Sequence, residues 1–221
     1  MPKSEKIRVV IADDHEIVRQ GVRNILEAAG GIELCGEATT GRDAVALCEK
    51  SSPDVAILDI SMPGLNGIDA ARQILKIRPK TRILIFTVHD AERLVYEVVE
   101  AGAHGYILKS DASRHLGAAV KAVLEGRHYF SSQVSEVLFE SFRNKNLPHT
   151  RSEDPAAKAI NREREIIQLL AEGKSNKEVA ASLGISVKTA ETHRAAIMRK
   201  LGFHSIGELV RYAVRNHLIE A

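Results

Sequence analysis

Val55-Ala56-Ile57-Leu58-Asp59 is the stretch that decides how this chain is expected to fold. Turn-forming residues stand on both sides of it, at Ser51–Asp54 and Met62–Gly64. A short apolar run with such borders indicates a buried strand of a parallel sheet. Asp59 stands at its carboxyl end, where ligands collect in open α/β sheets. Because a lone Asp there also fits a helix cap, its role depends on the rest of the chain.

Apolar runs alternate with helical patterns through the first part of the chain. This alternation predicts an α/β domain, a flavodoxin-like, doubly wound (βα)5 sheet with helices on both faces. A barrel is excluded because it needs eight strands and about 250 residues. The expected strands are Ile7–Ala12, Ile32–Ala38, Val55–Ile60, Ile83–Val88 and Gly105–Leu108, and the expected helices are His15–Ala29, Arg42–Lys50, Ile68–Ile77, Glu92–Ala101 and Ser113–Glu125.

The character of the sequence changes after Gly126. Ser131–Phe142 fits a short helix, and Arg143–Pro155 has the polar composition of a linker. Beyond it only helical periodicity appears. We therefore expect a first domain at 1–127, a short helix and linker at 128–157, and a small all-α domain at 158–221. Its expected helices are Arg162–Glu172, Asn176–Leu183, Val187–Leu201 and Ser205–Asn216.

Composition indicates a soluble globular protein. Of its 221 residues, 44% are hydrophobic and 27% charged. No apolar stretch approaches the roughly 18 residues of a membrane span, and the N-terminus lacks a signal-peptide pattern. Cys35 and Cys48 have no metal-binding spacing and suit a reducing cytoplasm, the expected location. Residues 1–149 carry 19 Lys/Arg against 20 Asp/Glu, and residues 150–221 carry 12 against 9, which supports a two-part chain.

Polar residues end four of the five expected strands. Asp13-Asp14 follow the first, Asp59 the third, Thr87 the fourth and Lys109 the fifth. Three clustered carboxylates call for a cation, and oxygen ligands with room for water suit Mg²⁺. A hydroxyl and an ammonium suit phosphoryl oxygens. Taken singly, Asp14 and Thr87 also fit helix caps and Lys109 an ordinary surface lysine. Together they predict a phosphoryl-transfer site with a carboxylate nucleophile.

From Ile7 to Glu125 the chain resembles the receiver domain of two-component response regulators, on Asp13-Asp14, Asp59 with Met62–Gly64 and Asn66-Gly67, Thr87, and Gly105-Tyr106 with Lys109. The resemblance implies that Asp59 accepts a phosphoryl group from a sensor histidine kinase. It implies that Asp13, Asp14, Asp59 and the backbone carbonyl of Ser61 hold Mg²⁺. It also makes Thr87 and Tyr106 the switch pair. A Tyr that simply packs at a sheet edge is the alternative for Tyr106.

The region around Asn176 to Ala195 has the punctuation of a helix-turn-helix. A short Ala-rich helix leads to a turn at Gly184, and Ser186 is placed to cap the next helix. Between Lys174 and Lys200 there are six Lys/Arg and two Asp/Glu, which suits DNA phosphates. On this pattern alone, a protein-binding helical bundle with solvated charges is the favoured alternative.

The longer pattern resembles the NarL/FixJ, or LuxR-type, DNA-binding domain over Arg162–Ile219, on Arg162-Glu163, Ala171–Glu178, Lys188–His193 and Lys200–Gly202. The resemblance implies that the helix at Val187–Leu201 enters the major groove of promoter DNA. Glu191, Thr192 and Ala195 would then face base edges, and Lys188 and Arg194 the backbone. The full set of expected DNA-contact residues is Lys177, Lys188, Thr189, Glu191, Thr192, Arg194, Ala195 and Arg199.

These features predict a DNA-binding transcriptional response regulator rather than an enzyme. Phosphorylation of Asp59 is expected to alter dimerisation and promoter binding, with a homodimer as the phosphorylated form. The first alternative is a receiver-type regulator controlled by protein contacts without phosphate. An aspartyl phosphatase of the haloacid-dehalogenase type needs a second Asp where Ser61 stands. A ligand sensor related to quorum-sensing regulators lacks the aromatic-rich pocket, since the chain has no Trp.

Overall fold

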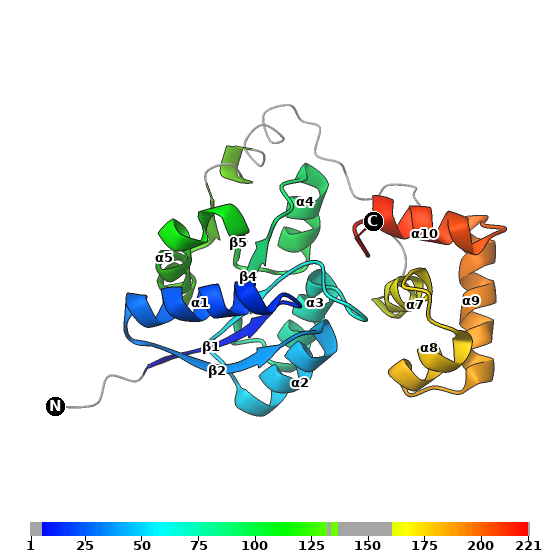
Figure 1. Cartoon of the computed structure of the whole chain (residues 1–221), viewed down its shortest axis with the longest axis horizontal. Helices are drawn as coiled ribbons and strands as arrows, with labels where there is room; N and C mark the ends of the chain where they lie inside the picture. The colour runs from blue at the N-terminus through cyan, green and yellow to red at the C-terminus, as the bar shows by residue number, and fades with distance from the viewer. Residues whose placement is uncertain (1–5, 132–133, 137–160, 221) are drawn as a thin grey trace.

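The computed structural model describes residues 6–131, 134–136 and 161–220 and contains two domains (Figure 1). The first alternates strands and helices, and the second is helical. The strands are β1 (Ile7–Ala12), β2 (Ile32–Ala38), β3 (Val55–Leu58), β4 (Arg82–Thr87), β5 (Gly105–Leu108) and β6 (Tyr129–Phe130). The helices of the first domain are α1 (Glu16–Ala29), α2 (Gly41–Ser51), α3 (Gly67–Ile77), α4 (Glu92–Glu100) and α5 (Ala112–Leu124), with a 3-10 turn at Lys109–Asp111.

The strands form one parallel sheet in the order β2-β1-β3-β4-β5-β6. The side of the sheet to which the chain adds successive strands changes at β1 and β3. These two strands are neighbours, and Ala12 lies opposite Leu58. The carboxyl ends of these two strands therefore meet at the switch point of the sheet, the place where doubly wound folds bind ligands. The expected α/β architecture is confirmed.

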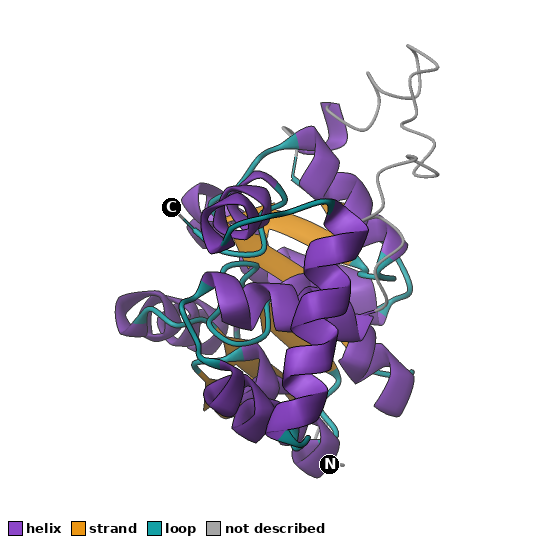
Figure 2. Ribbon diagram, turned by 90° about the vertical axis from the view of Figure 1, so that its right-hand side faces the viewer, coloured by secondary structure: helices purple, strands orange, loops and turns teal. Residues whose placement is uncertain are grey.

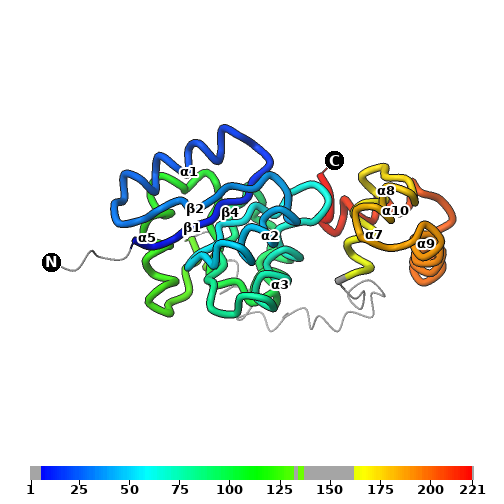
Figure 3. Tube along the Cα trace, turned by 90° about the horizontal axis from the view of Figure 1, so that it is seen from below, coloured from blue at the N-terminus to red at the C-terminus, as the bar shows by residue number. Residues whose placement is uncertain are grey.

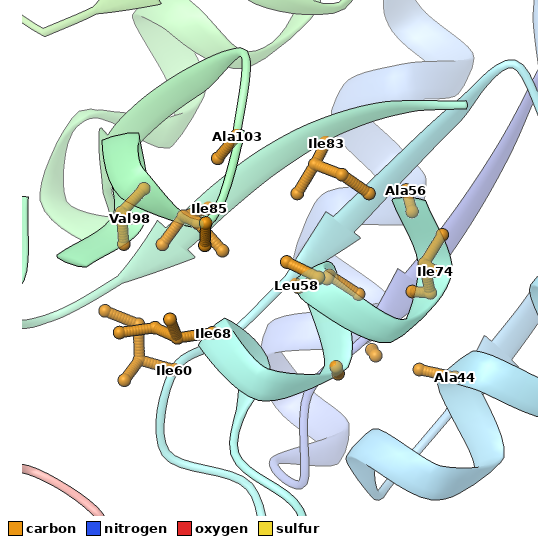
Figure 4. Packing of buried hydrophobic residues seen from close by; sticks show 14 of the residues in the cluster. Ala44, Ala56, Leu58, Ile60, Ile68, Ile74, Ile83, Ile85, Val98 and Ala103 are labelled. Carbon is orange, nitrogen blue, oxygen red and sulfur yellow. The ribbon is translucent and has the colours of Figure 1, made fainter. Parts of the chain in front are cut away.

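Two hydrophobic layers cover the sheet because successive side chains of a strand point to opposite faces. Ala56 and Leu58 of β3 face one layer with Ile74 of α3, and α2 and α4 complete it (Figure 4). Val55 and Ile57 face the other layer, which α1 and α5 cover. A strand buried on both faces reads as a continuous apolar run, as the sequence of β3 does.

The sheet extends beyond the expected five strands. β6 pairs in parallel with β5, Gly105 opposite Tyr129 and Tyr106 opposite Phe130, two residues past the expected boundary at 127. A two-residue strand carries too little periodicity to be predicted. Residues 134–136 are helical, within the expected helix Ser131–Phe142, and Val134 is buried against the core of the first domain. The rest of that helix from residue 137, and the linker Arg143–Pro155, lie outside the described residues.

The second domain packs four helices around an apolar core that includes Ile166, Val179, Ile197 and Leu209. Figure 2 shows the strands of the first domain behind and between the helices. The helices are α7 (Asn161–Ala171), α8 (Asn176–Leu183), α9 (Val187–Leu201) and α10 (Ile206–Arg215). In the described part of the chain, no helix is both long and apolar enough to cross a membrane.

All four helices of this domain end in the same hydrogen-bond pattern. At the end of α8, Ile185 N donates to Ala180 O and Gly184 N to Ala181 O, which is a Schellman motif. The matching bonds close α7, α9 and α10. The left-handed residue of the motif is a glycine in the first three helices and His217 in α10, at φ 51°. A non-glycine residue in that region is strained.

Candidate phosphoryl-transfer site and DNA-contact helix

Asp59 directly follows β3 and is buried, with 3% of its surface exposed. Its Oδ1 accepts a hydrogen bond from Ile60 N at 2.8 Å. The first residue of α3, Gly67, passes so close that a Cβ there would lie 1.8 Å from the Asp59 carbonyl oxygen. The cap of α3 is Asn66, whose side chain accepts from Asp69 N. Asp59 is therefore not a cap.

Asp13 and Asp14 follow β1 on the neighbouring strand. Asp13 is 1% exposed, and its Oδ1 accepts from His15 N at 3.0 Å. Asp14 is exposed, and its carboxylate lies 2.7 Å from Nδ1 of His15. The cap of α1 is His15 itself, with no side-chain capping bond among the described residues, so Asp14 does not cap the helix. His15 joins the carboxylate cluster, although nothing in the sequence distinguishes it from the other residues at the start of the helix.

Lys109 joins the two buried carboxylates. Its Nζ lies 2.7 Å from Asp13 Oδ2 and 2.9 Å from Asp59 Oδ2, and its side chain is 13% exposed. Burial raises the pKa of Asp59 although the ammonium opposes that shift. Burial alone would lower the pKa of Lys109, but the contacts with Asp13 and Asp59 outweigh it and raise that pKa. Lys109 is thus not an ordinary surface lysine.

Thr87 is the last residue of β4 and Tyr106 the second residue of the neighbouring strand β5, and both are fully buried. Thr87 Oγ1 accepts from His89 N at 3.4 Å, while α4 begins after Ala91, so Thr87 does not cap it. The Tyr106 hydroxyl donates to His89 O at 2.9 Å, and burial raises the pKa of Tyr106. Because β6 covers β5, Tyr106 does not lie on an edge strand. Both side chains thus contact the same short segment after β4.

His89 links this segment to the loop after β3. Its Nε2 lies 2.9 Å from the hydroxyl oxygen of Ser61. Its ring also lies 5.6 Å from that of His217, and its Nε2 lies 3.6 Å from Glu220 Oε1, both near the end of the helical domain. His89 cannot be identified from the sequence, because a histidine in a strand-to-helix loop has no distinguishing spacing. Its only signal is its place two residues after Thr87.

The carboxylate cluster fits a hard cation. One ligand atom from each of Asp13, Asp14, His15 and Asp59 can be chosen so that all lie within 4.8 Å of one another. Asp13 Oδ2 is buried without an aligned hydrogen-bond donor. An oxygen-rich set with one open, exposed side at Asp14 is the chemistry that Mg²⁺ selects.

The predicted helix-turn-helix is present in α8 and α9. Ser186 caps α9 by accepting from Thr189 N at 3.0 Å, and Gly184 is left-handed at φ 63°. Ala190 and Ile197 are the buried positions of α9, spaced seven residues apart. The Ser186 cap and the left-handed Gly184 confirm the expected cap and turn positions. The buried positions of α9 leave the opposite face of the helix exposed.

Most of the expected DNA-contact residues lie on that outer face. Seven of the eight are exposed: Lys177, Lys188, Thr189, Glu191, Thr192, Ala195 and Arg199. Arg194 differs, because it is half-buried and its guanidinium lies 3.4 Å from Asn176 Oδ1 at the start of α8. Thr192 donates its hydroxyl to Lys188 O at 2.9 Å. Figures 1 and 3 both place α9 on the side away from the sheet.

Comparisons with known proteins agree with both halves. The family described as response regulator receiver domain matches residues 9–121, and the family described as bacterial regulatory proteins, luxR family, matches residues 161–213. The chain therefore belongs to the two-component response regulators, and within them to those that carry a LuxR-type DNA-binding domain. The expected class of protein is confirmed.

Individual relatives match nearly the whole chain. The response regulator UvrY of Escherichia coli is 35% identical over 97% of this chain and 97% of its own. A structure of the Salmonella typhimurium RcsB response regulator matches 96% of this chain and 99% of its own, at 28% identity and a TM-score of 0.59. A structure of an RcsB–DNA complex matches 94% and 97%, at 28% identity and a TM-score of 0.58.

Proposed function

We propose that Asp59 is the phosphoacceptor of this response regulator and that a sensor histidine kinase is the donor. The observation that carries the proposal is the contact of one ammonium, Lys109 Nζ, with both Asp13 and Asp59 in a buried pocket at the switch point. Such a pocket already holds a positive charge where the negative charge of a phosphoryl group would arrive.

In this proposal a carboxylate oxygen of Asp59 forms a bond to phosphorus as the nitrogen–phosphorus bond of the donor histidine breaks. The released histidine nitrogen takes up a proton. Lys109 compensates the added charge, and the Thr87 hydroxyl donates to a phosphoryl oxygen. Thr87 can do so because the bond it accepts from His89 N leaves its proton available.

Mg²⁺ is the proposed cofactor, held by the carboxylates of Asp13, Asp14 and Asp59 and by the backbone carbonyl of Ser61. When bound, it neutralises charge on the phosphoryl oxygens. The three carboxylates come from two adjacent strand ends, so the chain needs no rearrangement of the sheet to bring them together. When the receiver changes state, the Tyr106 hydroxyl would keep or break its hydrogen bond to His89 O, and Tyr106 would thereby act with Thr87 in the switch.

The proposed output is promoter DNA bound by α9. Glu191, Thr192 and Ala195 would read base edges, and Lys188 with Lys177, Thr189 and Arg199 would contact the backbone. Arg194 would first exchange its contact with Asn176. Phosphorylation would favour a homodimer, whose half-sites are about one helical turn apart. We place this activity in the cytoplasm, which suits the free thiols of Cys35 and Cys48.

The test is DNA affinity with and without beryllofluoride, an analogue of the phosphoryl group, in the presence of Mg²⁺. DNA fragments that the protein binds are first selected from genomic DNA and labelled. Fluorescence anisotropy with these fragments then gives the dissociation constants. The proposal expects tighter binding for the wild-type chain and no change for Asp59→Asn. Equal binding under all conditions would favour a regulator controlled by protein contacts alone.

A further inference from the structure

The helical domain contacts the receiver through α7, which lies between the sheet and α9 (Figures 1 and 3). A second contact lies after α10, where Asn216 accepts from Arg93 and where His217 and Glu220 lie near His89. At one end of the α7 contact the guanidinium of Arg164 lies 3.4 Å from Asp69 of α3 and 3.0 Å from Glu97 of α4. Arg42 of α2 lies 3.1 Å from Glu165. All these charges are paired within the contact, and α9 takes no part in them. The docked arrangement therefore leaves the proposed DNA face open.

At the centre of the α7 contact, side chains of the helical domain form hydrogen bonds with the loop that follows Asp59. Gln168 is 1% exposed, and its Nε2 donates to Met62 O at 2.8 Å. Its Oε1 accepts from Asn66 N, also at 2.8 Å. Glu172 directly follows α7, and its Oε1 accepts from Gly64 N at 2.8 Å and from Gln168 Nε2 at 2.9 Å. Two side chains of the helical domain thus satisfy three backbone groups within five residues of the receiver.

This loop also carries the proposed metal-binding carbonyl of Ser61. Ser61 stands directly before Met62, whose carbonyl Gln168 holds, and its own hydroxyl contacts His89. The peptide groups on both sides of the proposed ligand are therefore tied down. On the Asp59 side, two hydrogen bonds within the receiver hold the carbonyl of Ile60: it accepts from Gly67 N at 2.9 Å and from Met62 N at 3.0 Å. Only the Met62 side is held by the other domain.

We propose that Gln168 and Glu172 are positioning residues of the metal site, supplied to the receiver by the DNA-binding domain. The inference rests on the proposed function for the metal site alone and needs neither phosphorylation nor DNA. By fixing the loop, the pair pre-organises the Ser61 carbonyl, so that Mg²⁺ binding does not have to order it. Losing such an outer partner of a ligand typically weakens metal binding by about 10-fold to 100-fold.

Coupling of this kind is reciprocal. If docking of α7 tightens Mg²⁺ binding, Mg²⁺ must tighten the docking of α7 by the same factor. Metal binding is thus transmitted to the helical domain while α9 remains exposed. Mg²⁺ binding thus changes the strength of the contact between the two domains and does not change access to α9.

Isothermal titration of the full-length chain with Mg²⁺ tests the proposal. Gln168→Ala is expected to raise the dissociation constant about 10-fold. Glu172→Gln keeps the acceptor oxygen and is expected to bind as the wild type does. Gln73→Ala is the matched control: Gln73 donates to Glu165 at 3.4 Å across the same contact but does not touch the loop. Circular dichroism verifies that each variant is folded.

A second measurement, hydrogen exchange of the wild-type chain, remains informative if Gln168→Ala does not fold. Mg²⁺ is expected to slow exchange of the α7 amides. The proposal is overturned if Mg²⁺ leaves the exchange rate of the α7 amides unchanged or raises it. It is also overturned if folded Gln168→Ala binds Mg²⁺ like the wild type. An equal loss in Gln73→Ala would also overturn it, by assigning the effect to docking in general. A wild-type chain that binds no Mg²⁺ would overturn both this inference and the proposed metal site, whereas loss of the DNA response alone would leave it standing.

Discussion

The ammonium of Lys109 lies 2.9 Å from Oδ2 of Asp59, in a pocket that excludes most water from both groups. The same nitrogen contacts Asp13, so one cation balances two buried carboxylates. A buried charge left without its partner is strongly destabilising. The stability of the receiver therefore depends on the positive charge of Lys109. Mg²⁺ bound to the same carboxylates would supply positive charge in its place.

Lys109→Met is therefore expected to lower the free energy of unfolding by about 3 kcal/mol in EDTA. Mg²⁺ should restore much of that loss, because it would neutralise the carboxylates that the lysine leaves behind. Urea unfolding with and without Mg²⁺ measures both effects. Lys121→Met, at an exposed lysine of α5, is the control. Equal losses in EDTA and Mg²⁺ would show that the metal does not reach these carboxylates.

Thr87→Ala is expected to accept the phosphoryl group but to lose the increase in DNA affinity. The reason is that Thr87 is the only proposed link between the phosphoryl oxygen and the His89 segment, which Tyr106 also contacts. Thr87→Ser keeps the hydroxyl and should keep the response. Anisotropy measurements with beryllofluoride separate the three proteins. A full response in Thr87→Ala would remove this residue from the switch.

The two kinds of DNA contact should differ in how their loss is seen. Glu191→Ala is expected to reduce discrimination at one base pair by roughly 1–3 kcal/mol, because a carboxylate can accept from cytosine N4. Lys188→Ala should weaken binding to all sequences and reduce the slope of log K against log salt by about 1. Titrations at several salt concentrations, on promoter and mutated sites, test both. Unchanged specificity in Glu191→Ala would place that residue away from the bases.

The end of α10 offers a test of backbone strain. His217 takes the left-handed position of the Schellman motif, where the other three helices of the domain have glycine. His217→Gly should stabilise the chain by about 0.5–1 kcal/mol, the relief of left-handed strain less the added entropy of glycine in the unfolded state. Chemical denaturation measures the change. A loss of stability would mean that the His217 contact with His89 outweighs the strain.

Glu208 gives the helical domain a defined acid sensitivity. Hydrogen bonds from His204 N and then Ser205 N lower the pKa of Glu208 from its ordinary 4.5. The stabilisation that follows is present above pH 4.5 and is lost as the pH falls through the lowered value. Glu208→Gln should be less stable than the wild type at neutral pH and equally stable in acid. Glu33→Gln, on an exposed residue of β2, is the control, and a gap that persists in acid would contradict the assignment.

How far the sequence predicts this protein depends on which contacts decide each feature. The strands β1, β2 and β5 and the helices α8 and α9 match the predicted bounds, because burial on a sheet and local capping are written in neighbouring residues. Strand ends of a parallel sheet share one edge, which is why the sequence predicts one site from Asp13, Asp14, Asp59, Thr87 and Lys109. Among them, the structure brings Lys109 into contact with Asp13 and Asp59. β6 cannot be predicted from the sequence, because two residues are too few to show a period.

The hydrogen bonds of Gln168 with the receiver cannot be predicted from the sequence for a different reason. Glu165 to Leu170 are all buried, polar residues included, because one side of α7 packs in the helical core and the other against the receiver. A single sequence shows the core side through its apolar spacing. It does not show which surface of the other domain buries Gln168, since that contact joins residues 102 and 106 positions apart.

The most direct test of the central claim is mass spectrometry of the chain after incubation with Mg²⁺ and a small phosphodonor such as acetyl phosphate or phosphoramidate. The account predicts that one phosphoryl group is added, that fragmentation places it on Asp59, and that Asp59→Asn and EDTA each prevent it. The account would be contradicted by an unmodified wild-type chain under these conditions, or by equal modification of Asp59→Asn.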